Sequence, residues 1–125
     1  MKLVDSTVAI DYLRAHRPAT ELLEETLGRG EPLGASEIVR FEVLAGVREG
    51  ELERVESFFG AVAWFPIDEV VSRLAGTLAS RFRRGHVGID APDYLIAATA
   101  LALDADLLTT NVRHFPTLEG LQAAY

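Results

Sequence analysis

Short apolar segments alternate with longer amphipathic segments along this 125-residue chain. Four of the short segments are apolar enough for buried strands, namely residues 2–5, 31–35, 63–67 and 106–110. The segments between them repeat apolar residues at helical spacing, most clearly at Val71, Leu74, Leu78 and Phe82. Strands that alternate with helices favour right-handed crossovers and a parallel sheet with helices on both faces. We therefore expect one α/β domain over residues 1–125, with three α/β/α layers around a mainly parallel sheet of four to five strands.

Capping residues and glycines set the expected helix boundaries. Ser36 and Asp68 are favourable N-caps, and Gly50 and Gly85 stand where helices should end. One helix should follow Asp5 directly, and the others should span about 18–27, 36–48, 52–59, 68–84 and 90–103. Residues 111–116 are expected to form a loop, and residues 117–125 fit neither pattern.

Composition excludes several classes of protein. The chain has no cysteine, which rules out a disulfide scaffold, a zinc knuckle, an iron–sulfur centre and a thiol nucleophile. Its longest nearly apolar run, 94–103, is far shorter than the ~20 residues that span a bilayer, so we expect a cytoplasmic protein without membrane association. The only lysine is Lys2, so a P-loop is absent, and an unrelated phosphotransfer domain that uses a lysine late in the chain is disfavoured.

The charge balance constrains how nucleic acid could be bound. Twelve basic residues against 19 acidic ones give a net charge of −7. This argues against binding through a broad basic surface. It leaves open an enzyme that acts on phosphodiesters with metal ions, because such a site is itself built from carboxylates.

Three acidic residues are expected to face inward. Asp5 ends a buried strand, Glu42 lies within the apolar stripe of its helix, and Asp93 lies in line with Ile96, Ala97 and Ala100. Taken singly, Asp5 could cap the next helix and Asp93 could accept backbone amides. Glu42 could likewise pair with Arg40 or Arg48. The single explanations do not account for three acids that a parallel sheet would bring to one edge, where Asn111 should also lie. A carboxylate cluster of this kind suits a hard cation such as Mg²⁺.

Four blocks of the sequence resemble the PIN-domain nucleases, and within them the VapC-type toxins of bacterial and archaeal toxin–antitoxin pairs. The blocks occur in the family's order and are Val4–Leu13, Glu37–Gly46, Asp93–Ala100 and Leu108–Phe115. No block is specific alone, but together they cover nearly the whole chain. The resemblance implies a PIN-like fold and a Mg²⁺- or Mn²⁺-dependent endoribonuclease that hydrolyses RNA phosphodiester bonds with metal-activated water.

The resemblance also assigns roles to individual residues. It implies that Asp5, Glu42 and Asp93 are the catalytic and metal-binding acids and that Thr7 orients Asp5 or a water. Asn111 matches a fourth polar position that is often aspartate, so a second metal should bind more weakly there. Asp90, one turn before Asp93, is a further metal ligand in one interpretation and the helix cap in the other.

Two groups of basic residues are candidates for contact with RNA. Arg81 and Arg84 share a face of the long helix, and Arg113 and His114 follow Asn111 beside the expected site. Arginine binds phosphate well through its planar fork, although the face that carries Arg81 and Arg84 could simply be solvated.

The family resemblance further suggests partners. It implies a homodimer and a cognate, VapB-like antitoxin whose C-terminal segment covers the active-site groove. Apolar residues that could serve such surfaces, or equally the core, are Leu44, Phe58, Phe59 and Trp64. Two other functions stay open: a catalytically silent PIN-like protein-binding module, and a PIN nuclease that acts on DNA. The intact set of three acids favours the enzyme.

Overall fold

Four short strands form one parallel sheet in the order β3-β2-β1-β4 in the computed structural model, which describes residues 1–125. The strands are β1 (Lys2–Val4), β2 (Leu33–Ser36), β3 (Ala63–Phe65) and β4 (Asp106–Leu108). The helices are α1 (Ser6–Leu13), α2 (Arg17–Gly28), α3 (Glu37–Ala45), α4 (Leu52–Ala61), α5 (Glu69–Phe82) and α6 (Ala91–Leu103), and a short 3₁₀ turn (Val112–His114) follows β4. The expected parallel sheet is confirmed, with four strands.

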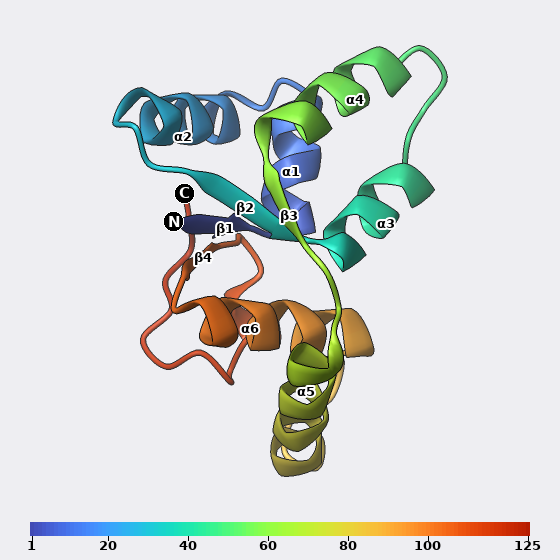
Figure 1. Ribbon diagram of the computed structural model, residues 1–125, viewed down its shortest axis with the longest axis vertical. Helices are drawn as coiled ribbons and strands as arrows, with labels where there is room; N and C mark the ends of the chain where they lie inside the picture. Colours follow the sequence, from blue (N-terminus) through green and yellow to red (C-terminus); the bar gives the residue numbers. More distant parts are fainter.

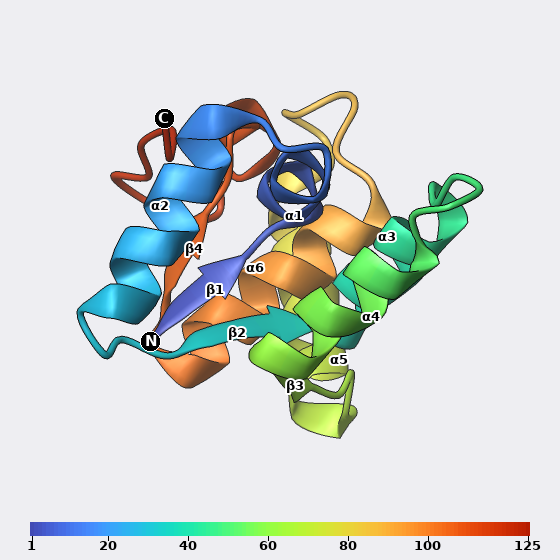
Figure 2. The same ribbon diagram turned by 90° about the horizontal axis from the view of Figure 1, so that it is seen from above.

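Helices cover both faces of the sheet and make three layers (Figure 1). Seen from above, α1, α2 and α4 lie in front of the sheet, whereas α6 and α5 lie behind it (Figure 2). Helix α6 lies between the sheet and α5, with Tyr94 and residues 96–100 buried. A helix packed on two sides needs apolar residues around most of its circumference, which explains the alanine-rich sequence of α6.

The chain changes direction between β1 and β4. From β1 it moves outward through β2 to β3, and it then crosses back to place β4 on the other side of β1. β1 is followed by α1, whereas β4 is followed by the 3₁₀ turn, so the chain leaves these two neighbouring strands in different directions. This divergence opens a crevice at the carboxyl ends of the two strands. Asp5 follows β1 and Asn111 lies shortly after β4, so the expectation that they share this edge is confirmed.

Element boundaries differ from the expected ones by a few residues. Helix α3 ends at Ala45 and not near Arg48, because Gly46 takes the C-cap position. Strand β3 stops before Pro66, which has no N–H to donate to a neighbouring strand. Strand β4 stops at Leu108, which pairs with Val4, because its partner β1 ends there and Asp5 already caps α1.

Two of the aromatic residues considered for partner surfaces belong to the core. Phe58 and Phe59 are buried in the main hydrophobic cluster, and Trp64 is half-buried against it. Leu44 is exposed on α3. No helix of the structure is both long and apolar enough to span a membrane.

Candidate active site

Asp5 is fixed at the junction of β1 and α1. It is 3% exposed and is the N-cap of α1, where its Oδ1 accepts the Ser6 N–H at 2.8 Å. Its Oδ2 accepts the hydroxyl of Thr109 at 2.6 Å and that of Thr7 at 3.2 Å. The alternatives of helix cap and site residue are therefore not exclusive, because one oxygen caps the helix and the other faces two hydroxyl groups.

Glu42 occupies α3 without a countercharge. Its Oε1 is buried and has no hydrogen-bond partner, and Arg40, one of its suggested partners, pairs with Glu37 instead. Burial raises the pKa of Glu42, the neighbouring Ser6 side chain opposes this, and the negative charges of Asp5 and Asp93 raise it further. An unpaired buried carboxylate oxygen is costly, so this atom is the strongest sign of a missing cationic partner.

Asp93 projects from the first turn of α6, with its side chain 17% exposed. Its Oδ2 accepts the backbone N–H of Asp90 at 3.1 Å and lies 3.3 Å from Nδ1 of His114. Burial raises the pKa of Asp93, and the nearby charges of Asp5 and Asp90 add to the rise. The amide of Asp90 and the charge of His114 lower it without cancelling the rise.

Asp90 is the N-cap of α6, as one of its two interpretations held. Its side chain nevertheless lines the same hollow as the other acids. This position also suits the second role considered for Asp90, that of an additional metal ligand.

Residues after β4 close the other side of the site. The Asn111 side-chain amide lies 3.0 Å from Nδ1 of His114, and the Thr110 amide donates to Thr7 Oγ1 at 3.3 Å. The Asn111 backbone amide donates to Thr109 Oγ1 at 3.0 Å. Thr7 therefore contacts both Asp5 and the segment after β4.

These side chains surround one hollow of about 240 Å³, in which Pro92 is the single lining residue without a polar side chain. It is lined by Asp5, Ser6, Thr7, Glu42, Asp90, Pro92, Asp93, Asn111 and His114. No three acidic or histidine side chains converge into a ready-made chelate. Mg²⁺ needs only one or two direct carboxylates, because it retains several waters.

Three of the basic residues considered for RNA contact do not line this hollow. Arg81 lines a separate, open depression on α5, next to Arg73. Arg84 follows the end of α5, and Arg113 lies in the 3₁₀ turn. Only His114 among the four candidates reaches the carboxylates directly.

Sequence reasoning missed Thr109. It is fully buried, yet its hydroxyl bonds to Asp5 and to the amide of Asn111. The available signal was the polar run Thr109-Thr110-Asn111 directly after an apolar strand, which places hydroxyls at the edge where a site was expected.

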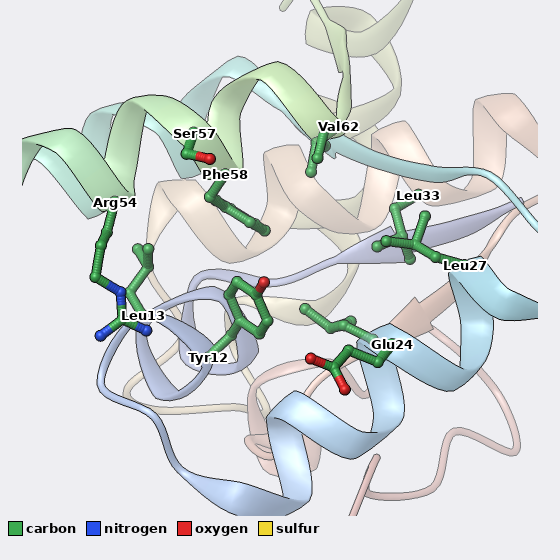
Figure 3. A pocket seen from close by; sticks show the side chains of 11 residues that line it. Tyr12, Leu13, Glu24, Leu27, Leu33, Arg54, Ser57, Phe58 and Val62 are labelled. Atoms are coloured by element: carbon green, nitrogen blue, oxygen red, sulfur yellow. The ribbon is translucent and has the colours of Figure 1, made fainter.

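A second hollow is apolar and separate from the acids. It holds about 190 Å³ between α1, α2 and α4, and the side chains of Tyr12, Leu27 and Phe58 line it (Figure 3). Arg54 and Glu24 lie at its borders (Figure 3). None of its lining residues belongs to the polar hollow, so the catalytic candidates do not depend on it.

Comparison with known proteins agrees with the motif blocks. The chain is 57% identical over 125 residues to Ribonuclease VapC19 of Mycobacterium tuberculosis, and the match covers 100% of both proteins. It is 39% identical to Ribonuclease VapC10 of the same organism, covering 100% of this chain and 93% of that protein. A toxin–antitoxin complex from Klebsiella pneumoniae contains a chain with the same fold, at a TM-score of 0.82 and 23% identity, covering 100% of this chain and 98% of that one. Residues 2–120 match the PIN domain family, and the chain therefore belongs to that family.

Proposed function

We propose that this protein is a divalent-metal-dependent endoribonuclease and the toxin of a toxin–antitoxin pair, with residues 1–125 forming one nuclease domain that acts in the cytoplasm. The observation that carries the proposal is that Asp5, Glu42 and Asp93, from three separate elements, all line one hollow whose side chains are nearly all polar. Full-length identity of 57% to a protein named Ribonuclease VapC19 supports the reaction class.

The residues present fit a Mg²⁺ or Mn²⁺ ion. Oε1 of Glu42 is buried with no donor, and burial together with the neighbouring acids raises the pKa values of Glu42 and Asp93. A cation relieves both penalties, and a site of carboxylates and one amide has the oxygen chemistry that Mg²⁺ prefers. Asp5 and Asp93 would hold the ion, with Glu42 beside them and Asn111 and Asp90 as further ligands. When bound, the ion would polarise the scissile phosphate and lower the pKa of the attacking water.

The protein's own groups hold the carboxylates in place for this chemistry. Thr7 and Thr109 donate to Oδ2 of Asp5 and fix its orientation. The amide of Asp90 does the same for Asp93. Asn111 supplies a neutral oxygen, so the residues after β4 add less negative charge than an aspartate would. Glu42 adds a third carboxylate beside Asp5 and Asp93, and its buried Oε1 has no hydrogen-bond partner within the protein.

RNA is the substrate that we propose. His114 lines the hollow and Arg113 precedes it, so these two side chains would contact the phosphate nearest the site of cleavage. Arg81 and Arg84 would contact phosphates farther along the strand, because arginine binds phosphate without reading sequence.

The proposed partners are a VapB-like antitoxin and a second copy of this chain. The fold is shared with a chain from a solved toxin–antitoxin complex, which supports an antitoxin. The apolar hollow of Figure 3 offers the antitoxin a place for apolar side chains, with the cation of Arg54 and the anion of Glu24 at its borders.

Cleavage of total cellular RNA by purified, antitoxin-free protein tests the function. Wild type should cut with Mg²⁺ or Mn²⁺ and stop with EDTA, and Asp5→Asn and Asp93→Asn should abolish cutting. Glu53→Gln removes an exposed acid on α4 and should leave cutting unchanged. If the folded wild type with metal cuts no RNA, the silent binding module is favoured. Cutting of single-stranded DNA alone would instead support the DNA nuclease.

A further inference from the structure

Residues 117–125, here called the return segment, lead back from the site toward α1. Leu118, Leu121 and Ala124 pack against the hydrophobic core. The segment is the red end of the chain in Figure 1, where it loops back past β4. It is therefore packed onto the body of the protein although it contains no helix or strand.

Two contacts fix the end of the return segment. The amide of Ala124 donates to the carbonyl oxygen of Thr109 at 2.8 Å. The hydroxyl of Tyr125 donates to Oδ2 of Asp11 on α1 at 2.6 Å, and its ring lies 5.6 Å from that of His16. Burial and the adjacent Asp11 raise the pKa of Tyr125, so the phenol stays protonated and keeps donating.

Thr109 connects these contacts to the acids. Its backbone carbonyl receives the Ala124 amide, and its hydroxyl donates to Oδ2 of Asp5 at 2.6 Å. The same hydroxyl oxygen accepts the Asn111 amide at 3.0 Å. Because a hydroxyl has a single proton, its donation to Asp5 sets its orientation, and the remaining lone pairs face Asn111.

We propose that the return segment and Thr109 form a positioning device for the metal site, in which the Ala124 amide holds the Thr109 backbone and the Thr109 hydroxyl orients Asp5 and the chain at Asn111. For its metal this inference rests on the proposed function. Groups that hydrogen-bond to metal ligands typically change metal affinity 10- to 100-fold when removed, by orienting the ligand before the ion arrives.

The first test removes the hydroxyl while preserving shape. Thr109→Val should weaken Mn²⁺ binding by about 10-fold or more in calorimetric titration, and Thr109→Ser should retain most of the affinity. Thr26→Val is the matched control, since Thr26 is equally buried and loses one hydroxyl bond, to the Leu22 carbonyl, away from the site. Wild-type affinity in Thr109→Val, measured on folded protein, would overturn the proposal.

The second test addresses the return segment without needing a metal. Ala124→Pro removes the N–H that Thr109 accepts, whereas Ala123→Pro removes an amide that makes no hydrogen bond. Amide exchange in the metal-free protein, followed by NMR, should be faster at Asn111 in Ala124→Pro than in wild type or Ala123→Pro. Unchanged exchange at Asn111 would overturn the coupling. This readout also separates the two proposals, because exchange can respond as expected even if wild type binds no Mn²⁺ and cuts no RNA.

Discussion

Nδ1 of His114 lies 3.3 Å from Oδ2 of Asp93, the carboxylate that projects from the first turn of α6. The charge of His114 lowers the pKa of Asp93, against the stronger effect of burial. The imidazole is thus the one basic side chain that opposes the crowding of negative charge at this acid.

We predict that His114→Ala raises the pKa of Asp93 further, because it removes a favourable positive charge while burial stays. A ¹³C NMR titration of the Asp93 carboxyl in metal-free protein measures this directly. The loss of Mn²⁺ binding as pH falls should then begin at higher pH in His114→Ala than in wild type. His86→Ala serves as the control, since His86 contacts Phe82 and not the acids. If the pKa of Asp93 is the same in His114→Ala as in wild type, the contact between His114 and Asp93 carries no charge interaction.

The metal-free protein should be destabilised by its own acids at neutral pH. Glu42 has a raised pKa in the folded state. At pH values between its ordinary pKa and this raised pKa, Glu42 is still protonated in the folded protein but has already lost its proton in the unfolded chain. The free energy of unfolding therefore falls as pH rises from the ordinary carboxyl range through the raised pKa of Glu42. Asp93 contributes with the same sign.

Glu42→Gln should accordingly raise the unfolding free energy of metal-free protein at pH 7 by about 1 kcal/mol, by removing the charge of a half-buried carboxylate that has no cationic partner. The gain should disappear at pH values below the ordinary carboxyl range, where both proteins carry a neutral side chain. Thermal unfolding across pH, with Glu53→Gln as the exposed control, tests this. The difference between variant and wild type is the relevant quantity, because Arg40 lowers the pKa of Glu37 and gives a slope of opposite sign. A Glu42→Gln protein that is less stable at pH 7 would contradict the assignment of strain to this acid.

The fold followed from the sequence because its signals are local. Asp68 caps α5 through the amide of Val71, as expected. Pro66 and Gly46 end β3 and α3 a few residues earlier than expected, but these causes are local too. The inward-facing acids were also readable, since helical periodicity placed Glu42 and Asp93 among apolar neighbours.

Contacts between distant segments of the chain could not be predicted from such local signals. Thr109 bonds to Asp5 across 104 positions of the chain, and Tyr125 bonds to Asp11 across 114. Periodicity describes faces of single elements, whereas these pairs depend on strand order and on the path of a segment without regular structure. The sequence also left open whether Asp5 caps a helix or serves the site, and the geometry resolves this by giving each of its two oxygens a different set of donors.

Metal binding should stabilise the wild type and depend on the charge at position 111. At a Mn²⁺ concentration 100 times the dissociation constant, linkage adds about 2.7 kcal/mol to the unfolding free energy. Asp5→Asn and Asp93→Asn should lose this gain. Asn111→Asp should instead increase Mn²⁺ affinity, because it replaces a neutral oxygen ligand with a charged one. Thermal shift and calorimetry with Mn²⁺ measure both effects. Equal affinity in Asn111→Asp and wild type would remove Asn111 from the set of ligands.

Arg81 and Arg84 should act on RNA and not on the metal. Neither forms one of the ion pairs of the structure, whereas Arg73 on the same helix is paired with Glu69 at 2.9 Å, so the two guanidinium groups are free to bind phosphate. The double variant Arg81→Gln/Arg84→Gln should raise the KM for RNA several-fold and leave Mn²⁺ affinity unchanged. If both contact phosphates, the slope of log affinity against log salt should also decrease in magnitude by about 1.4 for a single strand. Arg17→Gln/Arg29→Gln makes the same change of charge at the two ends of α2, where both arginines are paired with glutamates, and so controls for net charge. An equal loss in the two double variants would assign the effect to the overall charge of −7 becoming more negative, and would remove the α5 face from the path of the RNA.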